Sequence, residues 1–350
     1  MGIGPVSKRK HITIRDIARA SGASLTTVSL VLNNRGGRIS EATRTRIREA
    51  VHRLGYRPNR LAQGLQSQRA GMIAILVPQI QHAFADAYIG ELISAIHDRA
   101  SRAGHKILLE VAHPDFIARG EHRELFARHF VDGMLCIGVT NNDTYLRDFE
   151  NDGGPLVVVN NTIAGIRLNS VRCDYRAAGR LAGEHLIALG HRKIGLVHGA
   201  TEVETTGDFR RGFEDALTAA GLSLPNYRVA DGRFLEEGGA EAVFQILRVD
   251  SGVTAFLCGN DKMAIGAINA LVHAGRRVPH DVSVVGCDDL RQATFCNPRL
   301  TTVRTPLYDL GVRSCEALLS LIEGERDAVD EVRPVELIVR ESTAAAQPEV

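Results

Sequence analysis

The sequence lacks the segments that mark membrane and secreted proteins. No apolar run reaches the roughly 18–20 residues that a membrane-spanning helix needs. The N-terminal stretch MGIGPVSKRKH has no apolar core of the kind found in a secretory signal. We therefore expect a cytoplasmic protein without a membrane partner.

Paired cysteines are also missing. Six cysteines are scattered along the chain without any CxxC spacing: Cys136, Cys173, Cys258, Cys287, Cys296 and Cys315. A structural zinc site needs paired spacing, so a metal site is not expected. Scattered cysteines of this kind predict free thiols in a reducing compartment.

Motifs typical of enzymes with α/β folds are absent as well. No strand-like segment is followed by G-x-G-x-x-G, by a Walker A motif or by G-x-S-x-G. His185, His191 and His198 flank one strand-like segment but lack metal-ligand spacing, and Cys173 has no identifiable histidine partner. We expect a protein that is not an enzyme and needs no cofactor, with an α/β enzyme as the less favoured alternative.

Acidic residues are scarce in the first 70 positions. This segment holds 14 Lys and Arg residues against only Asp16, Glu41 and Glu49, a net charge of +11. The other 280 residues hold 28 basic and 38 acidic residues, a net charge of −10. A small basic segment on a large acidic body is typical of a nucleic-acid-binding head. Apolar residues at helical spacing inside the basic segment argue against a merely solvated tail.

Three short helices are predicted within residues 13–54. Thr13 and Asp16 have the spacing of a capping box, and Gly22 ends the helix that they begin. Ser24 can cap a second helix over residues 25–33, and Ser40 a third, in which apolar residues recur at helical spacing. Two short helices joined by a turn that contains glycine describe a helix-turn-helix.

From Gly71 onward, short continuous apolar runs alternate with amphipathic helices. The runs are MIAILVP, HKILLEV, DGMLCIGV, PLVVVN, RKIGLVHG, VTAFLCGN and VSVVGCDD. The helices are expected over 86–103, 120–130, 175–189, 208–221, 236–248 and 261–275. Continuous apolar strands between helices indicate parallel sheets covered on both faces. There are too many such units for one ordinary sheet, so we expect two doubly wound subdomains with ligands at the carboxyl ends of their strands.

Taken together, these segments resemble the lactose-repressor family of bacterial transcription regulators. The resemblance runs from about residue 11 to RESTA at 341–345 and rests on ITIRDIARASGASLTTVSLVLN, RIREAVHRLGYRPNRLAQGLQS, EHLIALGHRKIGLVHG, CGNDKMAIGA, DVSVVGCDD and PRLTTVRTP. It implies a helix-turn-helix head at 11–57, a hinge at 58–70 and a periplasmic-binding-protein-like core at 71–345. Its N-subdomain would take about 71–170 and 302–330, and its C-subdomain about 171–301 and 331–345. The implied location is the bacterial nucleoid.

The resemblance implies that helix 25–33 is a recognition helix in the major groove of double-stranded DNA. Its buried side would be Val28, Val31 and Leu32, and its outer face carries no acidic residue that would repel phosphates. Several family members have Arg or His where Leu30 stands, so a guanine contact by Arg is excluded there. The implied DNA-binding positions are Thr13, Ser24, Leu25, Thr26, Thr27, Ser29, Leu30, Asn33, Arg57, Asn59, Arg60 and Leu65.

In this resemblance, residues 58–70 form a hinge that becomes helical only when two subunits sit on DNA. Leu65 matches the side chain that wedges into the minor groove, and Arg57, Asn59 and Arg60 would contact the backbone. Leu65 has the plainer alternative of an ordinary linker leucine. Gly64 costs up to about 1 kcal/mol of helix propensity, which predicts a hinge that is disordered in free protein.

A small-molecule effector is expected between the core subdomains. The implied effector-binding positions are His82, Phe84, Asn160, Arg210, Phe234, Asn260 and Asp288. Aromatic, amide and carboxylate groups together suit a sugar or related polyol. Each of these residues also has an ordinary explanation, since Phe is usually core and Asn or Asp after a strand is often a turn or cap. The family's clamp Arg is replaced by Phe209, with Arg210 beside it as a possible substitute, and its loss disfavours a carboxylate effector.

The expected function is therefore a DNA-binding transcription regulator of the repressor type, controlled by a sugar-like effector. Two copies would read a palindromic operator, and the absence of a C-terminal leucine heptad predicts a homodimer rather than a coiled-coil tetramer. One alternative is a corepressor-type regulator of nucleoside or other metabolism, in which ligand tightens DNA binding. Another is an architectural DNA-binding protein without effector control, which the 270-residue core disfavours.

Overall fold

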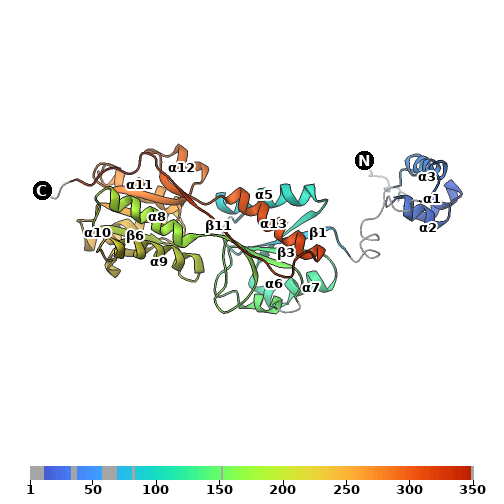
Figure 1. The fold of residues 1–350 in the computed structure, drawn as a ribbon, viewed down its shortest axis with the longest axis horizontal. Coiled ribbons are helices and arrows are strands. Elements are labelled where there is room, and N and C mark those ends of the chain that lie inside the picture. The colour runs from blue at the N-terminus through green and yellow to red at the C-terminus, as the bar shows by residue number, and fades with distance from the viewer. Residues whose placement is uncertain (1–11, 33–37, 57–68, 81–82, 151–152, 348–350) are drawn as a thin grey trace, which may run out of the picture. The chain divides into compact units, whose positions relative to one another are not determined.

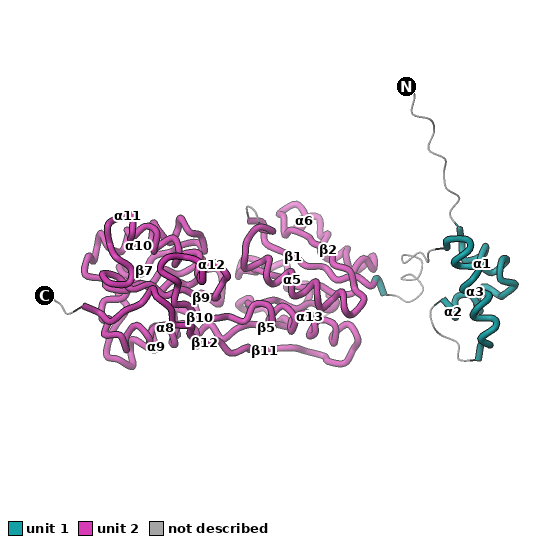
Figure 2. Tube along the Cα trace, turned by 90° about the horizontal axis from the view of Figure 1, so that it is seen from above, with its two compact units in different colours: residues 1–70 teal, residues 71–350 magenta. Residues whose placement is uncertain are grey.

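The computed structural model describes residues 12–32, 38–56, 69–80, 83–150 and 153–347. Two compact units divide the chain between Ala70 and Gly71, as the two colours of Figure 2 show. The division falls where the basic segment gives way to alternating strands and helices. No helix within the described ranges is long and apolar enough to cross a membrane.

The first unit contains three helices, α1 (Ile14–Ser21), α2 (Leu25–Leu32) and α3 (Glu41–Leu54). The predicted caps are present: Thr13 and Asp16 form the capping box, the Ser24 hydroxyl accepts the Thr27 N–H at 3.0 Å, and the Ser40 hydroxyl accepts the Thr43 N–H at 3.4 Å. The helices enclose a small core of Ile17, Val28, Val31, Ile47 and Ala50. The predicted helix-turn-helix is therefore confirmed.

The second unit is built on two six-stranded sheets (Figure 1). The first has the order β11-β5-β4-β3-β1-β2 and is parallel throughout. Its strands are β1 (Met72–Pro78), β2 (Lys106–Ala112), β3 (Gly133–Ile137), β4 (Leu156–Val159), β5 (Asn169–Cys173) and β11 (Asp330–Arg333). The runs of apolar residues predicted for β1 to β4 are strands because both faces of this sheet are covered.

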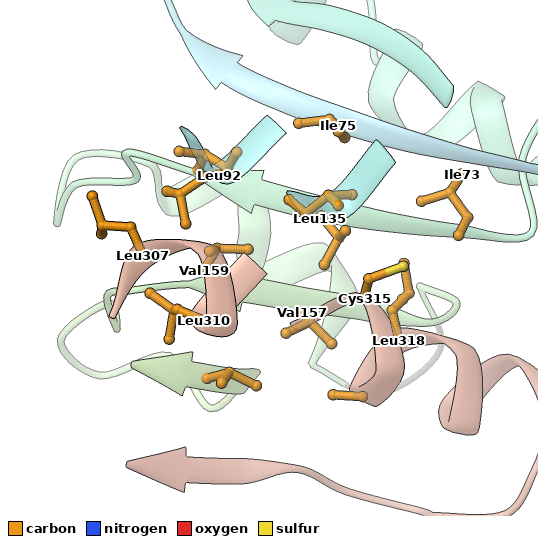
Figure 3. Packing of buried hydrophobic residues seen from close by; sticks show 14 of the residues in the cluster. Ile73, Ile75, Leu92, Leu135, Val157, Val159, Leu307, Leu310, Cys315 and Leu318 are labelled. Carbon is orange, nitrogen blue, oxygen red and sulfur yellow. The ribbon is translucent and has the colours of Figure 1, made fainter. Parts of the chain in front are cut away.

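Helices cover the two faces of the first sheet. One face packs on α5 (Ala87–Arg102) and α13 (Leu307–Glu323), and the side chains between them form the core that Figure 3 shows. The other face is covered by α6 (Pro114–Ala118), α7 (Glu121–Ala127) and the 3₁₀ segment η2 (Thr144–Phe149). A short 3₁₀ turn, η1 (Ala83–Ala85), precedes α5.

The second sheet has the order β12-β10-β9-β8-β6-β7. Its strands are β6 (Ile194–His198), β7 (Val229–Asp231), β8 (Ala255–Cys258), β9 (Ser283–Asp288), β10 (Thr301–Arg304) and β12 (Glu336–Ile338). All neighbours are parallel except β12, which pairs antiparallel with β10 and differs from the purely parallel expectation. One face packs on α8 (Tyr175–Ala188) and α9 (Glu204–Ala219), and the other on α10 (Glu236–Val249), α11 (Asp261–His273) and α12 (Arg291–Phe295). The short 3₁₀ turn η3 (Asn226–Arg228) precedes β7.

The chain passes between the two sheets three times, a few residues later than expected. The sequence divided the subdomains at about 170, 301 and 330. Strand β5 runs to Cys173 in the first sheet, β10 occupies Thr301–Arg304 in the second, and β11 runs to Arg333 in the first. The crossings therefore lie near residues 174, 305 and 334. The difference arises because β5, β10 and β11 contain polar residues and do not read as buried strands from sequence.

Helices α8 and α9 cross at two glycines. A Cβ on Gly179 would lie 1.9 Å from the Phe209 carbonyl oxygen, and one on Gly212 would lie 1.8 Å from the Arg176 carbonyl oxygen. Both distances are far below van der Waals contact, so the helix axes can approach this closely only where side chains are missing. The crossing also turns Phe209 into the core, where it is 3% exposed.

We expect Gly212→Ala to lower the free energy of unfolding by about 3 kcal/mol, because backbone blocks the added methyl group. Gly207→Ala in the same helix is the matched control. Its Cβ would meet only the flexible Arg211 side chain at 3.1 Å, and alanine improves helix propensity by up to about 1 kcal/mol. Urea unfolding followed by circular dichroism checks both, and equal midpoints for the two variants would contradict the close crossing.

Candidate functional site

The outer face of α2 is uncharged. Leu25 is 45% exposed and Thr26 is exposed, while Ser29 and Leu30 are partly buried. The opposite side holds Val28 and Val31 in the core, whereas Leu32 is only partly buried. The helix has no acidic residue in its first turn and no basic residue in its last. Such a face suits contacts with base edges and thymine methyl groups rather than with phosphates alone.

Three further positions proposed for DNA contact lie at helix starts. Thr13 is exposed, and both its N–H and its hydroxyl donate to the Asp16 carboxylate, at 2.9 and 2.7 Å. The exposed Ser24 hydroxyl lies 2.8 Å from the Thr27 hydroxyl while it caps α2. These side chains therefore fix the amino ends of α1 and α2, which leaves their contact with DNA a proposal. Five other positions proposed for DNA contact lie outside the described residues, namely Asn33, Arg57, Asn59, Arg60 and Leu65, and so does His82, which is proposed for effector binding.

In the second unit, polar side chains from both sheets meet at the carboxyl ends of the strands. Seven residues form what we term the polar cluster: Asp86, Tyr88, Asn160, Tyr175, Lys262, Asp288 and Thr305. Asn160 follows β4, Asp288 ends β9, and Thr305 follows β10, while the others lie at or beside the first turns of α5, α8 and α11. Because parallel strands end at one edge of a sheet, this is where a doubly wound fold places its ligands.

Asn160 is the centre of the polar cluster. Its side-chain nitrogen donates to the phenol oxygens of Tyr88 at 2.7 Å and Tyr175 at 2.9 Å, and its side-chain oxygen accepts the Cys173 N–H at 2.9 Å. Asn160 is 3% exposed and has a φ of 58°, a left-handed conformation that asparagine tolerates. Burial raises the pKa of both Tyr88 and Tyr175, so the phenols stay protonated.

Asp288 joins this chain of hydrogen bonds from the second sheet. Its carboxyl accepts a hydrogen bond from the Thr305 hydroxyl at 3.2 Å and is also hydrogen-bonded to the side chain of Tyr175. Burial, together with the nearby charge of Asp261, raises the pKa of Asp288 well above its ordinary range. This shift favours the protonated carboxyl, which can both donate and accept a hydrogen bond.

Asp261 lies behind Asp288 and shapes the end of β9. Its carboxylate accepts the Leu290 N–H at 2.7 Å and the Thr302 hydroxyl at 2.5 Å, and the residue is fully buried. Asp288 and Asp289 both have positive φ, at 116° and 58°, so the turn after β9 is strained. The two hydrogen bonds to Asp261 hold that turn in place. Burial raises the pKa of Asp261 to about 7.

An ion pair spans the two subdomains at the polar cluster. Lys262, in the first turn of α11, lies 2.8 Å from Asp86, which also accepts the Tyr88 and Ile89 N–H groups at the start of α5. The two side chains are 20% and 15% exposed. Three other cations that lie at or after strands of these sheets are also paired: Arg304 and Arg340 with Asp289, and Arg333 with Asp309.

The structure brings two other predicted residues together. Phe234 follows β7 at a φ of 59°, and its ring fills the space beside Gly199 at the end of β6. Asn260 caps α11 by accepting the Met263 N–H at 2.8 Å, and it donates to the Phe234 carbonyl at 3.4 Å. Asn260 is therefore partly occupied by a structural role, and Phe234 offers an aromatic face at the same edge of the sheet.

Two predicted residues have no recorded contact with the polar cluster. Phe84, in η1, is 54% exposed. Arg210 donates to Glu214 at 2.8 Å along the surface of α9. The sequence patterns missed five residues of the polar cluster: Asp86, Tyr88, Tyr175, Lys262 and Thr305. Tyr88 and Tyr175 lie in the first turns of helices, and the place of Tyr175 just after β5 is a signal that could have found it.

The fold and the site define a two-part binding protein: a helix-turn-helix unit for DNA and a ligand-binding unit of two parallel-sheet subdomains. Residues 13–59 match the family model "Bacterial regulatory proteins, lacI family", and residues 183–343 match the model "Periplasmic binding protein-like domain". The chain is 34% identical over 336 residues to the HTH-type transcriptional repressor PurR of Erwinia tasmaniensis. The alignment covers 95% of this chain and 97% of that protein.

Solved structures agree with these matches. The Lac repressor dimer bound to operator and the anti-inducer ONPF superposes with a TM-score of 0.84 at 27% identity, covering 96% of this chain and 100% of that one. The complex of the transcriptional regulator CelR with cellobiose gives a TM-score of 0.74 at 29% identity, covering 95% and 99%. The chain belongs to the LacI family of bacterial transcription regulators. It is a DNA-binding regulator of the repressor type under effector control, and not an enzyme.

The raised pKa of Asp261 makes stability depend on pH. Between about pH 4 and pH 7 the folded protein keeps a proton that the unfolded chain has lost, so stability falls as pH rises through this window. The total loss is about 4 kcal/mol at most. Asp261→Asn should flatten this decline in urea unfolding measured at several pH values.

Asp281→Asn is the control, because the Arg277 side chain and N–H lower the pKa of Asp281 to about 2, below the window. Its replacement should leave the slope between pH 5 and pH 7 unchanged. Parallel profiles for wild type and Asp261→Asn would show that Asp261 does not titrate there.

Proposed function

We propose that α2 reads the operator in the major groove, with residues 11–57 as the head, 58–70 as the hinge and 71–345 as the core. The uncharged, exposed face of α2 in an otherwise basic unit is the observation that carries this proposal. Base-edge contacts fall to Leu25, Thr26, Ser29 and Leu30, and phosphate contacts to the basic residues around them. The DNA-bound form would be associated with the nucleoid of a bacterial cell.

The operator is proposed to be palindromic and to be read by two copies of the chain. Support comes from the structure of the Lac repressor dimer bound to operator. An isologous dimer presents two heads related by a two-fold axis, and such a pair matches two inverted half-sites. Selection of binding sequences from random DNA tests this, and a single half-site without its inverted copy would exclude it.

Thr26→Ala should change the ranking of operator variants, because Thr26 is proposed to meet base edges. Arg60→Ala should instead weaken binding to all sequences alike and reduce the salt dependence by roughly one counterion, because it is proposed to meet phosphate. Fluorescence anisotropy on the selected operator and its single-base variants separates the two. If both variants lower the affinity for all sequences by the same factor, α2 does not read the bases as proposed.

We further propose that the effector binds at the polar cluster and is a neutral sugar or related polyol. Phenols offer hydrogen bonds without charge, the raised pKa of Asp288 favours its neutral form, and Phe234 offers an aromatic face. Lys262, Arg304, Arg333 and Arg340 are each paired with a carboxylate, which disfavours a carboxylate or phosphate ligand. The structure of CelR in complex with cellobiose supports the same class of ligand.

A thermal-shift screen against sugars, polyols, nucleosides and sugar acids tests the class of effector. A ligand that binds the folded state raises the melting temperature by mass action. We expect neutral sugars or polyols to do so and sugar acids to have no effect. A shift produced by nucleosides alone would support the corepressor-type alternative and overturn the assignment to sugars.

The effector is proposed to weaken operator binding by changing the relative orientation of the subdomains. Operator affinity should fall by about 5–150-fold with the ligand found in the screen, and the operator should weaken ligand binding by the same factor. Asp288→Ala should abolish the response and leave effector-free operator binding nearly intact. Asp215→Ala, which removes a surface partner of Arg176, is the control and should respond like wild type. A full response in Asp288→Ala would remove the polar cluster from the mechanism.

A further inference from the structure

The residue that connects the hinge to the core is held on both sides. The Asp132 carboxylate accepts the N–H of Gly71 at 2.7 Å and the N–H of Met72 at 3.3 Å. The Gly71 carbonyl oxygen accepts the Lys106 N–H at 2.9 Å, and the Met72 carbonyl oxygen accepts the Asp132 N–H at 2.8 Å. The start of β1 therefore meets the residues that precede β2 and β3. We term this place the joint, which consists of Gly71, Met72, His105 and Asp132.

The two polar side chains of the joint are largely buried. The Asp132 side chain is 6% exposed, and His105 Nε2 lies 3.7 Å from the same carboxylate oxygen that accepts the two N–H groups. A carboxylate that accepts backbone N–H groups makes hydrogen bonds roughly twice as strong as neutral ones. The first residues of β1 are therefore fixed by a charged group, and not by strand pairing alone.

Gly71 sets the direction in which the chain enters the core. Its φ is +65°, and a Cβ added there would meet no atom within 4 Å. Glycine is thus favoured by the backbone conformation and not by lack of space. The left-handed turn at Gly71, together with the two hydrogen bonds at its N–H and carbonyl, gives the chain one defined direction of entry into β1.

We propose that Asp132 is a positioning residue for operator binding, which acts by fixing Gly71. The head is linked to the core through residues 57–70, and any change in the core must pass through Gly71 to alter the placement of that segment. A fixed joint converts a subdomain movement into a defined displacement of the hinge. A loose joint adds freedom at the hinge end, so that placing two heads on an operator costs more conformational entropy.

The sharpest test compares two glycines in the full-length protein. Gly71→Ala strains the joint, and Gly275→Ala imposes the same strain at a φ of +77°, also with no atom within 4 Å, in the loop after α11. We expect similar small losses of melting temperature in both. Only Gly71→Ala should lower affinity, by roughly three- to tenfold, for the operator that wild type selects from random DNA.

Binding to a non-operator duplex should be equal in the two glycine variants, because it depends on the basic head and not on the joint. Equal operator affinity in Gly71→Ala and Gly275→Ala would overturn the proposal. So would an equal loss on operator and non-operator DNA in Gly71→Ala, because that would indicate a damaged head.

Two substitutions of Asp132 test the carboxylate itself. Asp132→Asn keeps an oxygen that can accept the Gly71 N–H, so its operator affinity should stay within about threefold of wild type. Asp132→Leu keeps the approximate volume without any acceptor, so its operator affinity should fall by about tenfold or more. Asp250→Leu, at a carboxylate that accepts the Gly252 N–H in the C-subdomain, is the control. If Asp132→Leu and Asp250→Leu lose stability equally and both keep operator affinity, Asp132 has only a structural role. If Asp132→Leu does not fold, the comparison of the two glycines decides the question.

Discussion

The side-chain amide of Asn160 connects the two subdomains at the place where the chain first leaves the first sheet. Its oxygen bonds the Cys173 N–H, where β5 ends and the chain leaves the first sheet, and its nitrogen bonds the phenols that begin α5 and α8. One buried group therefore ties a strand of the first sheet to a helix of each subdomain. Because a buried polar group is costly to leave without partners, these three hydrogen bonds couple the position of the polar cluster to the crossing of the chain.

Charge around the polar cluster is organised by pairing and burial. Asp86 and Lys262 neutralise each other across the subdomains, while burial near Asp261 raises the pKa of Asp288 and so favours its neutral form. Removing one member of this largely buried pair leaves the other charge without its partner, whereas a neutral ligand can exchange hydrogen bonds without disturbing the pair. These electrostatics are the basis for proposing an uncharged ligand.

Short sequence patterns predict the helix caps and the apolar strands. The features that they do not predict depend on contacts between residues far apart in the sequence. The caps at Thr13, Ser24 and Ser40 lie within three residues of the N–H groups they serve, and buried strands such as β1 read as apolar runs. Strands β5 and β11 carry polar side chains at one end of the sheet and gave no such signal. Tyr88 and Tyr175 are 87 residues apart and meet only because both bond Asn160, which no local pattern records.

Strand β1 runs from the joint at one edge of the first sheet toward the polar cluster at the other. Its amino end is the joint at Gly71, and the segment after its carboxyl end carries Asp86 and Tyr88 of the polar cluster. Five of its seven residues are buried, and it pairs in register with both β2 and β3, so the sheet cannot bend locally without breaking close packing. Under the proposed mechanism, a change at the polar cluster would therefore move this sheet as one body about the three crossings. A rigid rotation of this kind would carry the joint with it, and the proposed hinge ends at the joint.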